Sequence, residues 1–89
     1  MVRHLRIFGQ VQGVGFRDQF SQQAQRLGIA GWVRNRRGGN VEAMIQGSPA
    51  AVESLLAWAR IGPPGASVER VEVSAAEGSF AGFSLRPTE

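Results

Sequence analysis

The order of elements predicted along the chain is strand, helix, strand, strand, helix, strand, which indicates an α/β (α+β) fold of two layers. Two observations lead to this order. Apolar residues recur at helical spacing in two segments, and they alternate with polar residues in the segments around them. The order is typical of the ferredoxin-like split βαβ sandwich, an antiparallel four-stranded sheet with two helices on one face. A short extra C-terminal strand is also expected.

The first half of the chain predicts a strand, a loop and a helix. Arg3 to Phe8 alternates basic and apolar side chains and ends at Gly9, which is a strand pattern. The segment Gln10 to Phe16 is interrupted by glycines and is predicted to be a loop. From Arg17 the period becomes that of an amphipathic helix of about three turns, which Gly28 can close as a C-cap. The apolar stripe of this helix consists of Phe16, Phe20, Ala24 and Leu27.

The second half predicts a hairpin, a second helix and two further strands. Ile29 to Arg34 and Val41 to Gln46 are short strand patterns, and Arg36 to Asn40 supply the turn between them. Ser48 is a good N-cap for the helix that follows, and Gly62 with the two prolines after it ends that helix. The buried stripe of the helix and the apolar positions of the last two strands are Val52, Leu55, Leu56 and Ala59, then Val71 and Val73, then Phe83 and Leu85.

Length and composition indicate one domain, residues 1–89, that depends on packing alone. A chain of 89 residues can bury only one modest core. It contains no cysteine, which excludes disulfides and thiolate catalysis, and His4 is its only histidine, so no metal or other cofactor is expected. No apolar run approaches the ~18 residues that a membrane span needs. The first residues lack the pattern of a signal peptide, so the predicted location is cytoplasmic.

All ten positively charged residues are arginine, and the formal net charge is +3. Arginine suits bidentate recognition of phosphate, so small anions are plausible partners. Arg34, Arg36 and Arg37 form the one cluster and are expected to be a solvated hairpin tip that could attract an anion. His4 is expected to be a surface or packed residue. The aromatic residues expected in core and edge packing are Trp32, Trp58, Phe16, Phe20, Phe80 and Phe83.

The segment Gly9 to Arg17 has the features of an anion-binding loop. Its glycines allow positive φ angles, which can turn successive N–H groups toward one point. The following helix adds unpaired amides and a positive dipole end, and Arg17 sits in its first turn. The segment lacks the Gly-Lys-Ser/Thr ending of a nucleotide-binding P-loop. From these residues alone a plain tight turn with a solvated Arg17 is equally possible.

The same segment resembles the first signature of the acylphosphatase family, a glycine, a Val-Gln-Gly-Val run and an aromatic-Arg ending. Residues 31–47, GWVRNRRGGNVEAMIQG, resemble the second signature, with Asn35 and Gly39 at the family's spacing. Many relatives have a small hydroxyl residue after this asparagine, where this chain has Arg36. The resemblance continues through Gly62–Ala66, Val68–Val73 and Phe80–Arg86, so it covers nearly the whole chain.

The resemblance implies a metal-independent, monomeric hydrolase that cleaves the carboxyl-phosphate bond of a small acyl phosphate, releasing carboxylate and inorganic phosphate. It implies that loop amides and the Arg17 guanidinium bind the phosphate, while Asn35 orients the attacking water. Because an acyl phosphate has a good leaving group, positioning and charge stabilisation suffice for this chemistry. The implied catalytic residues are Arg17 and Asn35, and the implied phosphate-binding residues are Val11, Gln12, Gly13, Val14, Gly15, Phe16 and Arg17.

Two other interpretations stay open. An asparagine before an Arg-Arg-Gly-Gly turn commonly serves turn geometry, and the chain could be a catalytically idle regulatory member of the family. A ferredoxin-like sheet can also bind RNA, and the chain is basic. Such a sheet places aromatic residues on its exposed face, and here Phe8 is the only outward aromatic predicted. Neither a nucleic-acid partner nor a membrane partner is expected.

Overall fold

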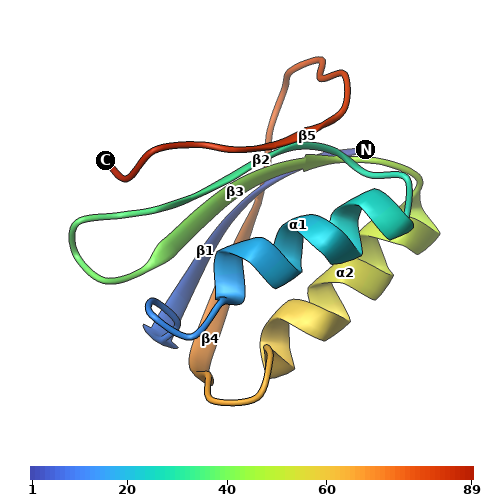
Figure 1. Cartoon of the computed structure of the whole chain (residues 1–89). Coiled ribbons are helices and arrows are strands. Elements are labelled where there is room, and N and C mark those ends of the chain that lie inside the picture. Colours follow the sequence, from blue (N-terminus) through green and yellow to red (C-terminus); the bar gives the residue numbers. More distant parts are fainter.

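The computed structural model describes all 89 residues as two layers, a sheet and a pair of helices that cover one of its faces (Figure 1). Neither helix combines the length and apolar character needed to cross a membrane. The elements are β1 (Val2–Gln10), α1 (Phe16–Arg26), β2 (Ala30–Asn35), β3 (Val41–Gln46), α2 (Pro49–Ile61), β4 (Ser67–Ala75) and β5 (Phe83–Leu85).

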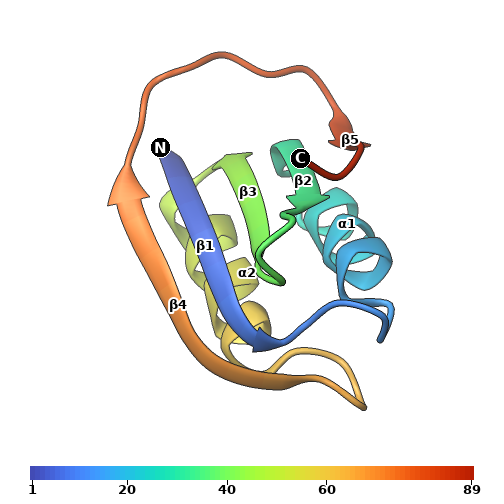
Figure 2. The same cartoon turned by 90° about the vertical axis from the view of Figure 1, so that its left-hand side faces the viewer.

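The sheet has the strand order β4-β1-β3-β2-β5, which Figure 2 shows from one edge to the other. The first four strands pair antiparallel, as the ferredoxin-like prediction requires, and that prediction is confirmed. The extra strand β5 pairs parallel with β2 through Gly31↔Phe83 and Val33↔Leu85. β2 therefore has a strand neighbour on each side over residues 31–33, and the C-terminal segment after β5 bonds the end of β2 through Glu89.

The core lies between the sheet and the helices. Alternation along β1 turns Leu5 and Ile7 toward the helices, where both are fully buried. On the helical side Phe16 and Phe20 of α1 pack on Trp58 of α2, with ring centroids 5.3 Å and 6.1 Å apart. These aromatic contacts fix where α1 begins relative to the sheet, and they set the position of its N-terminus.

The boundaries of three strands differ from the predictions. β1 and β4 continue to Gln10 and Ser67, which pair beyond an irregularity at Phe8/Gly9, so Ser67 belongs to a strand rather than to the predicted turn. β2 starts one residue later than predicted because the Ile29 N–H still bonds the carbonyl of Ala24 at 2.8 Å.

The face of the sheet without helices holds an aromatic residue that the sequence analysis did not place there. Trp32 pairs with Met44, and it is buried as predicted, but its cover consists of arginines rather than helices. The guanidinium groups of Arg34 and Arg86 lie 4.8 Å and 4.6 Å from the centre of its ring. The prediction of Phe8 as the only outward aromatic is therefore wrong, although cation-π stacking leaves Trp32 little exposed.

Candidate active site

The loop between β1 and α1, residues 11–15, borders the candidate site. Val11 is almost fully buried and anchors the start of the loop in the core. Gly13 and Gly15 have φ angles of 76° and 75°, a left-handed conformation that a side chain disfavours. Glycine at these positions lets the chain turn sharply between strand and helix.

The backbone N–H groups of this loop have no acceptor inside the protein. None of those from residues 11–15 donates to another backbone carbonyl. The first N–H groups of α1 also lack intrahelical partners, as at any helix start, and the N-cap Gly15 has no side chain to accept from them. Together with the positive end of the helix dipole, these donors form a site suited to a phosphate-sized anion.

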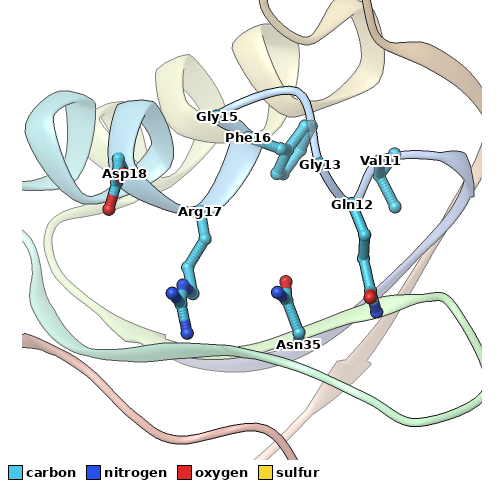
Figure 3. A pocket seen from close by; sticks show the side chains of 8 residues that line it. All are labelled: Val11, Gln12, Gly13, Gly15, Phe16, Arg17, Asp18 and Asn35. Carbon is cyan, nitrogen blue, oxygen red and sulfur yellow. The ribbon is translucent and has the colours of Figure 1, made fainter.

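Arg17 projects its side chain from the first turn of α1 into the space beneath the loop (Figure 3). Its Nη1 donates a hydrogen bond to the carbonyl of Arg86, at 3.2 Å, and no carboxylate lies within salt-bridge distance of it. The guanidinium is thus held by one neutral contact while its charge is not neutralised. Its remaining N–H groups are free to bind an anion.

Asn35 is the last residue of β2 and faces the loop from the opposite wall (Figure 3). Its backbone carbonyl accepts from the N–H of Glu89 at 3.1 Å. Its side-chain amide forms no hydrogen bond within the protein and remains accessible from the pocket. It therefore offers one donor and one acceptor group to whatever occupies the pocket.

A pocket of about 250 Å³ separates the loop from β2. All the predicted site residues line it except Val14, whose side chain instead packs against the core. Asp18 lines the pocket although it was not predicted, and it is the one acidic residue there. The full lining consists of Val11, Gln12, Gly13, Gly15, Phe16, Arg17, Asp18 and Asn35.

The side chain of Gln12 has a structural role that the sequence analysis missed. Its Nε2 donates to the carbonyls of Arg36 and Asn40, at 2.7 Å and 2.8 Å. These two carbonyls belong to the β2–β3 hairpin, directly after Asn35. A single side chain therefore joins the loop with the free N–H groups to the hairpin that carries Asn35. The sequence held no signal for this, because the partners are backbone atoms far along the chain.

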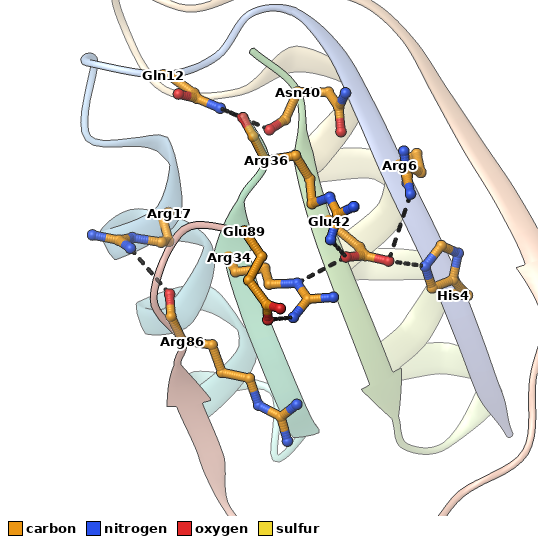
Figure 4. A network of polar contacts seen from close by, with 10 residues as sticks. All are labelled: His4, Arg6, Gln12, Arg17, Arg34, Arg36, Asn40, Glu42, Arg86 and Glu89. Atoms are coloured by element: carbon orange, nitrogen blue, oxygen red, sulfur yellow. Dashed lines mark hydrogen bonds and ion pairs between the residues drawn. The ribbon is translucent and has the colours of Figure 1, made fainter. Parts of the chain in front are cut away.

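On the other face of the sheet, the carboxylate of Glu42 collects several cations (Figure 4). Arg34 Nε and Arg36 Nη1 lie 2.9 Å and 3.4 Å from its Oε1, and His4 Nε2 lies 2.6 Å from its Oε2. Burial by itself raises the pKa of Glu42, but hydrogen bonds with His4 and Arg34 and the nearby charges outweigh it. The pKa of this carboxyl is therefore below its ordinary value.

This arrangement corrects the prediction that Arg34, Arg36 and Arg37 form a solvated tip. The Arg34 side chain is only 17% exposed and also pairs with the carboxylate of Glu89, so two of the three arginines are tied to acids. Arg37 alone is exposed at the tip. Glu42 lies on the sheet face without helices, but the cations around it leave the residue only 7% exposed.

Comparison with known proteins assigns the chain to a family. The acylphosphatase family model matches residues 3–85. A protein of Thiobacillus denitrificans named acylphosphatase is 55% identical over 83 residues, which is 93% of each chain. One of Thermococcus kodakarensis with the same name is 60% identical over 70 residues, covering 79% of this chain and 77% of that protein.

The fold agrees with the sequence matches. The crystal structure of acylphosphatase from Bacillus subtilis superposes with a TM-score of 0.89 at 32% identity, over 97% of this chain and 99% of that one. An acylphosphatase structure from Coxiella burnetii gives a TM-score of 0.91 at 32% identity, over 96% and 90% of the two chains. Since sequence and fold match over nearly the full length, the chain belongs to the acylphosphatase family.

Proposed function

We propose that the pocket between the loop at residues 11–15 and the end of β2 is the active site of an acylphosphatase. The observation that carries this proposal is the row of unbonded backbone N–H groups beside Arg17, facing Asn35 across one pocket. Such donors bind a phosphoryl group without any rearrangement, which is the electrostatic contribution that phosphoryl transfer needs most.

In the proposed reaction, the oxygens of the phosphoryl group accept hydrogen bonds from the backbone amides of residues 11–16. The Arg17 guanidinium forks onto the same group and offsets its negative charge. The Asn35 amide accepts from a water molecule and directs it at phosphorus. Water adds to phosphorus while the bond between phosphorus and the carboxyl oxygen breaks. The products are a carboxylate and inorganic phosphate, and the proton from water passes to solvent.

The substrate class supported by this geometry is a small acyl phosphate, because the donors recognise the phosphoryl group. No general acid is needed in this scheme, since a carboxylate leaves without protonation at neutral pH. We propose no cofactor. That the chain acts as one domain over residues 1–89, as a cytoplasmic monomer without a nucleic-acid or membrane partner, stays a prediction.

The proposal is tested by measuring hydrolysis of benzoyl phosphate in EDTA by the wild type and by Arg17→Ala and Asn35→Ala. Arg26→Ala is the matched control, since Arg26 is exposed at the far end of the same helix and bonds only Gln23. Metal-free turnover lost in the first two variants and kept in the third is expected. Folding is checked by circular dichroism.

A folded wild type without turnover would contradict the proposal. The same protein would then be assayed for retention on a polyanion that weakens steeply with salt, the behaviour of a nucleic-acid-binding domain. Full activity in folded Arg17→Ala or Asn35→Ala would leave the enzyme assignment intact but remove that residue from the mechanism.

A further inference from the structure

The orientation of the Asn35 side chain has to be set from outside the pocket. No hydrogen bond within the protein holds its amide group, and the residue lies at the last position of β2, where pairing with β3 ends at Asn35↔Val41. Backbone bonds already support the strand end, since the Asn35 carbonyl accepts from the Glu89 N–H at 3.1 Å and the Arg36 N–H donates to the carbonyl of Asn40 at 2.8 Å. Contacts made by the side chains on either side of Asn35 would add to these bonds and limit the directions that its amide can sample.

The residues on either side of Asn35 are held by one carboxylate on the opposite face of the sheet. Side chains alternate across a strand, so Arg34 and Arg36 project away from the pocket while Asn35 projects into it. Both guanidinium groups reach the same oxygen of Glu42, Oε1, at 2.9 Å and 3.4 Å (Figure 4). The two contacts therefore hold the residues before and after Asn35 on the sheet face opposite the pocket.

The carboxylate of Glu42 is itself held in place by several neighbours. Glu42 pairs directly with Arg34 across β2 and β3, and with Arg6 across β3 and β1, so it stands on a central strand. Its second oxygen lies 2.6 Å from His4 and 4.0 Å from Arg6. A buried carboxylate with these partners resists displacement, because loss of a partner would leave an uncompensated charge.

We propose that Glu42 is a positioning residue for Asn35: through Arg34 and Arg36 it holds the end of β2 so that the Asn35 amide faces the bound phosphoryl group. The proposal rests on the proposed function, in which Asn35 orients water. It assigns Glu42 a role in the chemical step and none in binding phosphate, since Glu42 contacts neither the loop amides nor Arg17.

The test is a double-mutant cycle between Glu42→Ala and Asn35→Ala, with kcat for benzoyl phosphate and the inhibition constant of inorganic phosphate as readouts. Glu42→Ala should lower kcat about 10-fold to 10²-fold, the loss typical of a misplacement near 1 Å. The inhibition constant should stay within about twofold, since the phosphate contacts are retained. In the Asn35→Ala background the same substitution should cost less than about twofold, because the group it positions is gone.

Glu72→Gln is the matched control. Glu72 lies on the same sheet face and pairs with Arg70 at 3.1 Å, but it belongs to β4 and has no contact with β2. Its removal should leave both readouts unchanged. If Glu42→Ala fails to fold, Glu42→Gln decides, since glutamine keeps an acceptor for Arg34; it should retain more activity than alanine and show the same split between kcat and the inhibition constant.

Three results would overturn the proposal: wild-type kcat in a folded Glu42 variant, an equal loss of phosphate affinity, or an equal loss of kcat in the Asn35→Ala background. The last would show a general structural role. Failure of the proposed function is distinguishable, because it appears as a folded wild type without turnover. Failure of the role proposed for Asn35 appears as undiminished turnover in Asn35→Ala alone.

Discussion

The loop that borders the pocket and the hairpin loop that follows Asn35 satisfy their backbone groups in opposite ways. The loop at residues 11–15 donates no backbone hydrogen bond to another carbonyl. The hairpin loop at residues 36–40 is closed by bonds from Arg36 N to Asn40 O, at 2.8 Å, and from Gly39 N to Arg36 O, at 3.0 Å. It is also held from outside by the Gln12 side chain and by the backbone of Glu89.

This difference shows how an anion site keeps its shape. An unpaired N–H group costs free energy unless it donates to water or to a ligand. A loop whose N–H groups stay free for a ligand therefore cannot be stabilised by its own backbone hydrogen bonds. Its shape must come from elsewhere: from left-handed glycines, from the burial of Val11, and from Gln12. The hairpin loop does not keep N–H groups free for a ligand. Its internal hydrogen bonds can therefore hold Asn35 in place. Each prediction below tests one side of this comparison.

The largest effect is expected for Arg17→Ala, which breaks the anion-binding side. The variant loses the guanidinium fork, so kcat/KM for benzoyl phosphate should fall on the order of 10³ or more, by analogy with the loss of an oxyanion donor. The inhibition constant of inorganic phosphate should rise in parallel. Undiminished phosphate affinity in this variant would show that the loop amides alone hold the anion.

Asn35→Ala, which breaks the hairpin side, should lose activity through kcat. We expect a decrease of about 10²-fold, typical of a lost water-positioning group, while phosphate inhibition changes little. Steady-state kinetics with phosphate as competitor separates the two terms. An equal loss of phosphate affinity would mean that Asn35 contributes to anion binding.

Gln12→Ala should uncouple the two loops. It removes two hydrogen bonds to buried or half-buried carbonyls, each worth about 0.5–1.5 kcal/mol, so the free energy of unfolding should fall by about 1–3 kcal/mol. Urea denaturation measures this change. The control is Gln22→Ala at an exposed position of α1, which should have almost no effect. Equal stability of the two variants would disprove the coupling.

Gly13→Ala should destabilise the protein through backbone strain, whereas the matching substitution in the hairpin loop should not. Gly13 has φ of 76° with open space around an added Cβ, so alanine costs only the left-handed conformation, about 1 kcal/mol. In the hairpin loop Gly38 does not have a positive φ, and its added Cβ would lie 3.6 Å from the flexible amide of Asn40. Gly38→Ala should therefore be nearly neutral. Urea denaturation of both variants makes the comparison, and equal losses would contradict it.

The smallest effect concerns pH. Because the pKa of Glu42 is lowered in the folded protein, its ionised form stabilises the fold above the unfolded pKa of about 4.5. This contribution should be lost as pH falls from about 5 through the folded pKa. Glu42→Gln should remove that part of the acid dependence, measured as the free energy of unfolding against pH. An unchanged slope in Glu42→Gln would assign acid sensitivity to other carboxyls.

Much of the fold was predictable because its signals are local. Helical and alternating periods marked every element, and the glycines with Ser48 marked the boundaries within one or two residues in most places. β1 and β4 were the exceptions, since their ends depend on pairing with each other. The site was predictable as a loop and one arginine in the next helix, which lie together in the chain. Asn35 was placed in it by resemblance, and the structure brings that residue to the same pocket.

What the sequence determined by itself is therefore the order of elements, the glycine-rich loop and the position of Arg17 at a helix start. Each depends on neighbours in the chain. Only the tertiary structure decided that Gln12 bonds the hairpin, that Glu42 gathers Arg34, Arg36 and His4, and that β5 lies parallel to β2. These contacts join residues far apart in the chain, and the register between strands, which sets them, is a property of the whole sheet rather than of any segment.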